Sequence, residues 1–111
     1  MGPKHYFFGS EIPLEDLGNK IRRKVLAYND NLMMVLVQFE KGAVGKIHSH
    51  PHEQITYVLE GEFEFIIGSD RNVVKAGDSM YKEPNIPHGT TCLEKGVLLD
   101  VFCPYREDFV N

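Results

Sequence analysis

The sequence predicts an all-β fold, and three observations support this prediction. Apolar residues occur in short runs, and nearly every run ends in a turn signal rich in Gly, Asn, Asp or Pro. Several runs alternate apolar and polar residues, which is the period of a strand with one buried face. Helix signals are weak and are limited to residues 11–17 and the acidic end near Glu107. Many short strands with turns at the corners are typical of a sandwich or barrel.

The clearest strand is the run in which Phe63, Phe65 and Ile67 share one face opposite Glu62 and Glu64. Other runs are β-branched or aromatic, as strands prefer. The predicted strands are residues 20–28, 32–40, 54–59, 62–67, 73–74 and 97–102.

Turn residues separate these runs and set their order. Glu60 and Gly61 are predicted to form a tight turn between two strands, and residues 29–31, 41–42, 68–72 and 76–78 form the other turns. Pro84 and Pro87 are expected in a loop or at a strand edge, because proline cannot donate to a sheet ladder.

Length and charge limit the class of protein. A chain of 111 residues fits one domain, which we divide into an arm (1–19), a barrel (20–103) and a tail (104–111). The net charge of −4 argues against a nucleic-acid partner. No apolar run approaches the roughly 18 residues of a membrane span, and no signal peptide is evident. With two cysteines, Cys92 and Cys103, we expect reduced thiols and a cytoplasmic protein.

One strand has apolar residues on both faces. Ile55, Tyr57 and Leu59 lie on the face opposite Gln54, and in a single barrel such a face needs cover. We therefore expect a homodimer.

Histidines in the run from residue 48 to 54 form the candidate site. In an extended segment His48 and His50 point to the same side, and Gln54 stays in phase with them. Two imidazoles on one face can start a metal site, although histidines on a polar surface loop are the alternative for an isolated pair. His52 is in phase by count, but Pro51 is expected to bend the chain and turn its ring towards the barrel mouth.

The spacing of this run resembles the first signature motif of the cupin superfamily, and a second, looser motif follows it. The first motif comprises Gly42, His48, His50, Gln54 and Gly61, and the second comprises Gly77, Asp78, Pro84, Pro87 and His88. Gln54 stands where the superfamily usually has Glu, and Cys92 where it usually has Asn. The resemblance implies a double-stranded β-helix, or jelly-roll barrel.

The same resemblance implies one divalent cation on His48, His50, Gln54 and His88. These ligands are all neutral, so the ion would keep its full charge and attract anionic substrates. Ni, Zn, Mn and Fe all accept such ligands. The alternative to direct ligation is that Gln54 forms a hydrogen bond to one of the metal ligands. Cys92 is expected to be a small buried residue, and a fifth metal ligand is the alternative role for it.

A narrower resemblance extends from His48 to Gly61 and over residues 100–109. Both stretches look like the pectin-degradation cupins of the KdgF type, which open 4,5-unsaturated uronates from pectin or alginate to the linear keto form. In that subfamily the metal works with residues that match Asp100, Phe102 and Arg106. The resemblance thus implies a small anionic sugar as the substrate.

The three residues suit that chemistry. Asp100 can move a proton as the enol becomes a ketone, and Arg106 can hold the uronate carboxylate in its planar fork. Phe102 lies two residues after Asp100 and can wall the sugar ring. A surface ion pair between Asp and Arg is the alternative on spacing alone. Two other functions are possible for this site: a small metal-dependent oxygenase and a non-catalytic sugar-acid-binding module. Gln54 argues against the oxygenase, because Fe(II) oxygenases favour a carboxylate ligand.

Overall fold

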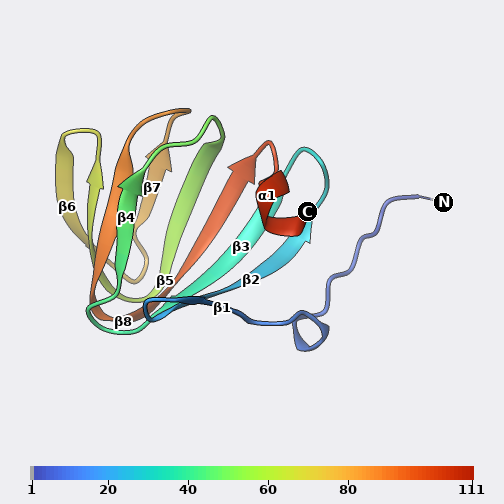
Figure 1. The fold of residues 1–111 in the computed structure, drawn as a ribbon, viewed down its shortest axis with the longest axis horizontal. Helices are drawn as coiled ribbons and strands as arrows, with labels where there is room; N and C mark the ends of the chain where they lie inside the picture. The colour runs from blue at the N-terminus through green and yellow to red at the C-terminus, as the bar shows by residue number, and fades with distance from the viewer. Residues whose placement is uncertain (1) are drawn as a thin grey trace.

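The chain folds into one curved antiparallel sheet whose two halves face each other. The computed structural model describes residues 2–111. Its elements are η1 (Gly9–Glu11), β1 (Glu15–Gly18), β2 (Ile21–Tyr28), β3 (Met33–Phe39), β4 (Val44–His48), β5 (Glu53–Ile67), β6 (Asp70–Lys75), β7 (Ser79–Lys82), β8 (His88–Cys103) and α1 (Glu107–Val110). The all-β prediction is confirmed (Figure 1).

Two long strands carry the architecture. The hydrogen-bonded order is β1-β2-β3-β8-β5-β6, and in addition β4 pairs with β8 and β7 with β5. Because β5 and β8 each pair along most of their length with each other and with two further strands, they run through both halves of the curved sheet. This is the jelly-roll arrangement that the cupin resemblance implies.

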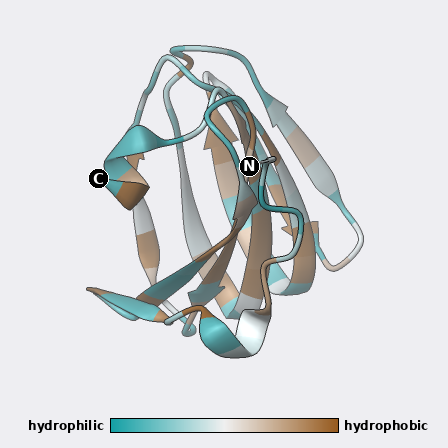
Figure 2. Ribbon diagram, turned by 90° about the vertical axis from the view of Figure 1, so that its right-hand side faces the viewer, coloured by the Kyte–Doolittle hydropathy of each residue, from teal (hydrophilic) through white to brown (hydrophobic). Residues whose placement is uncertain are grey.

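The inner faces of the two halves form the core. Val58, Phe63, Cys92 and Leu98 pack in one cluster, and a second cluster groups Met33, Val35 and Phe102. Figure 2 shows the hydrophobic residues recurring along the strands of the sheet. Alternation of apolar and polar side chains along each strand places one set inside and the other in solvent.

The predicted tight turn at Glu60 and Gly61 is wrong, because β5 continues through it. Before Gly61 the even-numbered residues from Gln54 to Val58 are buried, and after it the odd-numbered Phe63 and Phe65 are buried. The pairing of β5 with β8 shifts register here, and Gly61 has a φ of +85°. A bulge therefore exchanges the faces of the strand without ending it.

Other departures also come from tertiary pairing. Residues 15–18 form the edge strand β1 because they pair with β2, so the weak helix signal over residues 11–17 is wrong for its second half. β4 and β7 were not predicted as strands, and β8 begins at His88, well before the predicted start at residue 97. The turn predicted over 68–72 is shorter, because β6 already begins at Asp70. The loop containing Pro84 and Pro87 and the C-terminal helical turn are as predicted.

Candidate metal centre

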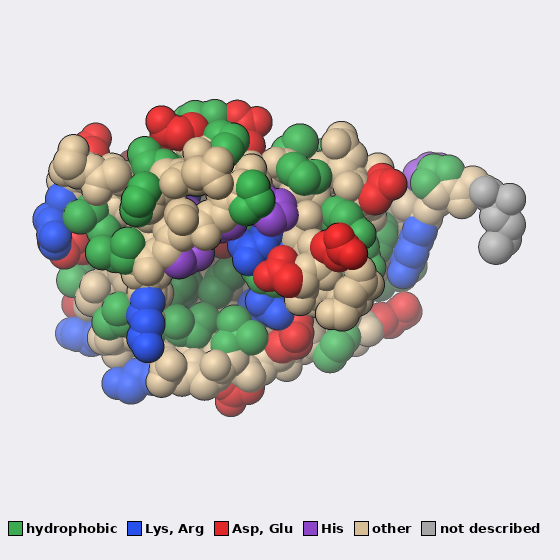
Figure 3. All heavy atoms as spheres, turned by 45° about the horizontal axis from the view of Figure 1, so that its top comes forward, with side chains coloured by type: hydrophobic (Ala, Val, Ile, Leu, Met, Phe, Trp, Pro, Cys, Tyr) green, Lys and Arg blue, Asp and Glu red, His purple; other side chains and the backbone are tan. Residues whose placement is uncertain are grey.

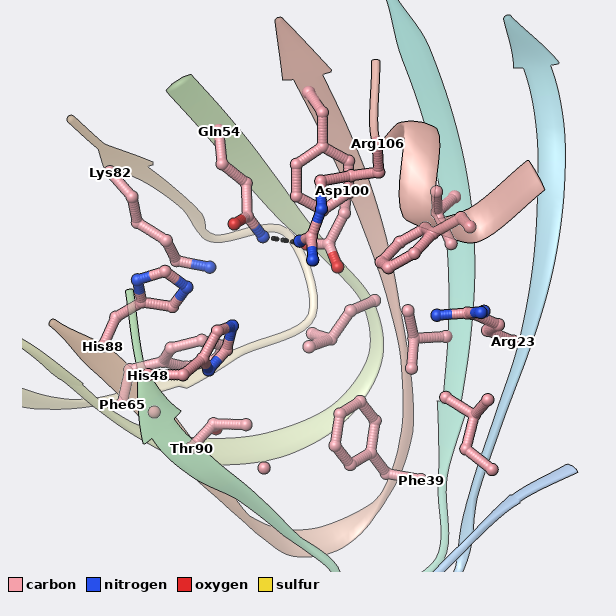
Figure 4. A pocket seen from close by; sticks show the side chains of 18 residues that line it. Arg23, Phe39, His48, Gln54, Phe65, Lys82, His88, Thr90, Asp100 and Arg106 are labelled. Carbon is pink, nitrogen blue, oxygen red and sulfur yellow. Dashed lines mark hydrogen bonds between the residues drawn. The ribbon is translucent and has the colours of Figure 1, made fainter. Parts of the chain in front are cut away.

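A hollow between the two halves of the sheet holds the candidate site. The cavity has a volume of about 170 Å³. Its apolar wall is formed by Val35, Val37, Phe39 and Leu98, and its polar wall includes His48, Gln54, Lys82, His88, Asp100 and Arg106. Figure 3 shows the hollow with hydrophobic side chains inside it and histidines and basic side chains at its edge. Figure 4 shows the polar side chains turned toward one another.

Three histidines from two distant parts of the sequence meet beside this wall. His48 ends β4, His50 follows in the loop before β5, and His88 begins β8. Pairing of β4 with β8 places His48 opposite His88. One ring nitrogen of each histidine lies within 4.8 Å of those of the other two, which is a spacing that can hold a metal ion. The structure thus brings together the three predicted imidazoles.

A backbone carbonyl lies beside Nδ1 of each of the three rings. Nδ1 of His48 lies 2.9 Å from the carbonyl oxygen of Lys46, and Nδ1 of His88 lies 2.9 Å from that of Ile86. Nδ1 of His50 lies 3.1 Å from the carbonyl oxygen of His52. A carbonyl only accepts, so Nδ1 is the donor in these contacts, and Nε2 of a neutral ring in that tautomer keeps its lone pair. This is the usual way in which a protein presents imidazole to a metal.

Burial keeps two of these rings uncharged. Burial lowers the pKa of His88 to about 4, and the positive charge of Lys82 acts in the same direction. Burial also lowers the pKa of His50, with the charge of Arg106 contributing. Neutral imidazole is the form that binds a metal, so both rings are ready for ligation at neutral pH.

Gln54 is oriented by the groups behind it. Its Nε2 donates to Oδ1 of Asp100 at 3.0 Å and to the hydroxyl of Thr56 at 3.2 Å. The amide oxygen therefore faces Nε2 of His50, 2.9 Å away. The neutral His50 ring has one N–H for two acceptor oxygens, those of His52 and Gln54. In the tautomer with the proton on Nδ1, the Nε2 lone pair faces the lone pairs of the Gln54 oxygen. A cation bound to both atoms removes the repulsion, so the donor set fits a divalent ion.

Asp100 belongs to this network and not to a surface ion pair. The fully buried Thr56 hydroxyl donates to Oδ1 of Asp100 at 2.5 Å. Oδ1 thus accepts two hydrogen bonds, while no residue from 2 to 111 donates to Oδ2. Because Asp100 also lines the cavity, it has one oxygen free for a ligand there.

Arg106 lies at the cavity with one edge already occupied. Its Nε and one Nη donate to the two carboxylate oxygens of Asp108 at 3.0 and 2.9 Å, and this holds the pKa of Asp108 below its usual value. The guanidinium retains its other edge, formed by its two Nη groups. Its Cζ lies 5.2 Å from the centre of the Phe102 ring and 4.3 Å from that of Phe109. Phe102 is buried, with its ring 5.7 Å from that of His50.

Sequence reasoning missed two basic residues of the cavity, Lys82 and Arg23. Lys82 is on β7, two residues from Met80, which packs against the core. Lys82 and Met80 are two residues apart, so in a strand both side chains point to the same face. This could have predicted that Lys82 points inward, but only if β7 had been recognised as a strand. Arg23 lies on β2 with its Cζ 3.8 Å from the centre of the Phe109 ring, and no signal in the sequence marks it.

His52 and Cys92 stand outside the triad. The chain bends at Pro51 and His52, as expected, and the His52 ring packs edge-on to His50 at 5.4 Å. Its Nδ1 is buried without a hydrogen-bond partner in residues 2–111. Cys92 packs in the core, as expected, and burial raises the pKa of its thiol.

The jelly-roll fold and its inward-facing histidines define a cupin. Residues 35–102 match the Cupin domain family, and the chain belongs to it. The fold and the triad are compatible with a divalent metal. No helix within residues 2–111 is long and apolar enough to cross a membrane.

Relatives within the cupins match almost the whole chain. It is 45% identical over 109 residues to the pectin degradation protein KdgF of Dickeya dadantii, covering 96% of this chain and 99% of that protein. An RmlC-like cupin from Shewanella frigidimarina superposes with a TM-score of 0.93 at 42% identity, covering 97% of both chains. KdgF from Halomonas sp. superposes with a TM-score of 0.92 at 34% identity, covering 97% of this chain and all of that one.

Proposed function

We propose that this cupin is a metal-dependent enzyme that opens and ketonises 4,5-unsaturated uronates released from pectin or alginate. The observation that carries the proposal is the shared cavity, in which neutral metal-ligand side chains face a carboxylate and a guanidinium. The pectin-degradation names of its relatives support the same substrate class.

We propose His48, His50, Gln54 and His88 as the ligands of one divalent ion. The ring nitrogens of the three histidines, which lie within 4.8 Å of one another, and the Gln54 oxygen turned toward His50 support this set. The bound ion would supply a double positive charge that no ligand neutralises, and Ni, Zn, Mn or Fe all suit these donors.

Asp100 is the proposed proton carrier. In the cyclic substrate the ring oxygen joins C1 to C5, and C5 is doubly bonded to C4. Asp100 accepts the proton of the C1 hydroxyl as the bond from C1 to the ring oxygen breaks, which leaves an aldehyde at C1 and the electron pair on the ring oxygen. Return of the proton to C4 turns the resulting enolate into a ketone, so the reaction is an isomerisation and requires no oxidant. The unshared Oδ2 of Asp100 supports this role.

Arg106 and Phe102 position the substrate in this proposal. The free edge of the Arg106 guanidinium suits the uronate carboxylate, and Asp108 holds the guanidinium in place from the other edge. Phe102 supplies an apolar surface beside His50 for the sugar.

The test is the ultraviolet absorbance of an unsaturated uronate at its enol double bond, followed with metal-loaded protein. We expect rapid loss of the band with the intact protein and with a surface control, His5→Ala, and no acceleration with His48→Ala. Equal rates for the intact protein and His48→Ala would reject the proposal. Iron-dependent oxygen uptake would then favour an oxygenase, and uronate binding without turnover a sugar-acid-binding module.

We further propose that the protein is a single cupin domain, with its arm, barrel and tail at 1–19, 20–103 and 104–111, and that it forms a homodimer in the cytoplasm. Ile55, Tyr57 and Leu59 support the dimer, because each exposes more than two-fifths of its surface (52%, 42% and 44%) on the outer face of β5. A second copy of the chain would cover this face.

A further inference from the structure

Lys82 is a buried cation that the proposed reaction has not used. Only 2% of its surface is exposed, and the side chain reaches from β7 into the cavity lined by His48 and His88 (Figure 4). Its Nζ donates one hydrogen bond, to the hydroxyl of Thr56 at 2.7 Å. The Nζ also lies 4.9 Å from the centre of the Phe65 ring.

This environment leaves the ammonium group under-satisfied. A lysine ammonium has three N–H donors, and Thr56 is the one acceptor that the residues from 2 to 111 provide. No carboxylate in that part of the chain forms a salt bridge with Lys82. A buried cation without a direct counter-ion is costly, so the cavity favours an anionic ligand at this position.

The hydrogen bond to Thr56 does not by itself explain why a lysine is buried at position 82. The Thr56 hydroxyl already donates to Asp100 and accepts from Gln54, so it is satisfied without Lys82. Burial also lowers the pKa of Lys82, and the nearby charge of Asp100 opposes that shift. A residue that is costly to bury and unnecessary to its neighbour points to a ligand-binding role.

We propose that Lys82 binds the substrate oxygen on which negative charge develops, and so forms with the metal centre a site for an enolate or carboxylate oxygen. The identity of that oxygen rests on the proposed function. As the bond from C1 to the ring oxygen breaks, the electron pair stays on the ring oxygen, and Lys82 donates a hydrogen bond to it. The proton of Lys82 stays on nitrogen, and the proton that reaches C4 comes from Asp100. Lys82 is then a catalytic residue, since a donor aimed at a developing oxyanion lowers the barrier.

Oxalate tests this site without turnover, because it is a planar dianion with the shape of an enolate beside a carboxylate. Its affinity is measured by calorimetry for Ni²⁺-loaded protein, for Lys82→Met and for an exposed control, Lys75→Met. We expect Lys82→Met to bind oxalate at least about tenfold more weakly, since hydrogen bonds to charged groups are strong. Lys75→Met should match the unaltered protein, and all three should hold equal amounts of nickel. Unchanged oxalate affinity in Lys82→Met, or no oxalate binding by the unaltered protein, would overturn the proposal.

Turnover provides an independent readout. Because the charge develops in the transition state, Lys82→Met should lower kcat about 100-fold or more, with little change in KM. A change confined to KM would contradict catalysis by Lys82. If the unaltered protein did not ketonise the uronate, the proposed function would be rejected. The oxalate comparison would still test whether Lys82 binds an anion.

A crystal structure of the intact Ni²⁺-loaded protein with oxalate serves if Lys82→Met does not fold or does not hold metal. An oxalate oxygen within hydrogen-bond distance of the Lys82 Nζ would support the proposal. Oxalate bound elsewhere, with Lys82 still bonded to Thr56 alone, would reject it.

Discussion

The Gln54 amide and the Asp100 carboxylate meet back to back behind the histidine triad, with Nε2 of Gln54 donating to Oδ1 of Asp100 at 3.0 Å. This contact ties the proposed metal ligand to the proposed proton carrier, because the bond that turns the Gln54 oxygen toward His50 also occupies one oxygen of Asp100. A glutamate at position 54 could accept but not donate. The carboxylate of Asp100 therefore favours an amide over an ionised glutamate at this position.

Replacing Gln54 by Glu tests this relationship. Two carboxylates would then face each other behind His50, so we expect the free energy of unfolding of the metal-free protein to fall by about 1–3 kcal/mol. Chemical denaturation of metal-free Gln54→Glu, with Gln38→Glu on β3 as the control, measures the change. Added divalent metal should reduce the loss, since carboxylate is also a good ligand. Equal stability of the two variants would show that the contact does not select the amide.

Asp100→Asn tests proton transfer. The amide keeps an oxygen that can accept from Thr56 and Gln54, so we expect the melting temperature and the metal content to change little. Loss of the proton carrier should reduce the ketonisation rate about 100-fold or more. The absorbance assay on metal-loaded protein measures this, and full turnover by the variant would exclude Asp100 as the carrier.

His88 should make the metal-free protein sensitive to acid. Burial lowers its pKa from 6.5 to about 4, so between these values the unfolded chain binds more protons than the folded one. The free energy of unfolding is then expected to fall by up to about 3 kcal/mol as the pH drops from about 6.5 to 4. Below about pH 4, His88 should cause no further loss of stability. His50 contributes in the same direction.

Urea denaturation of metal-free protein at several pH values measures this slope. His88→Gln cannot titrate and should show a shallower slope than the unaltered protein over the same range. Identical slopes would mean that His88 does not have a lowered pKa in the folded state.

Gly61 should tolerate no side chain. A Cβ there would lie 2.5 Å from the carbonyl oxygen of Lys95 and 2.6 Å from Cα of Gly96, and the φ of +85° disfavours other residues. We expect Gly61→Ala to lower the free energy of unfolding by about 2 kcal/mol or more, because the backbone at Lys95 and Gly96 must move to make room for the Cβ. Gly2→Ala, which meets nothing within 4 Å, is the matched control in thermal denaturation. Equal melting temperatures would show that the bulge can accommodate a side chain at residue 61 without loss of stability.

Ile55→Lys tests the proposed dimer. A charge on the exposed apolar face of β5 should prevent a second copy from packing there, so the variant should be monomeric. Light scattering during gel filtration measures the mass. Val73→Lys, on β6 at a residue that is 57% exposed, is the control and should remain dimeric. A monomeric unaltered protein would reject the dimer itself.

Local patterns in the chain were enough to predict the class of fold and most strand positions. Alternation in β3 and along the second part of β5 is a property of neighbouring residues, so it can be read without knowing the partners. The spacing of His48, His50 and Gln54 along the chain likewise predicted that they share a side. The motif that adds His88 came from resemblance, and the pairing of β4 with β8 brings its ring to the others.

Pairing between distant strands produced the features that these patterns did not predict. Whether Glu60 and Gly61 turn or bulge depends on the register between β5 and β8, and whether residues 15–18 coil or extend depends on the edge of β2. The inward direction of Lys82 follows from pairing of β7 with Gln54 and Thr56 on β5. Local sequence encodes which faces are apolar. The cost of burying an ammonium group beside a carboxylate network depends on long-range contacts, which form only when the sheet closes.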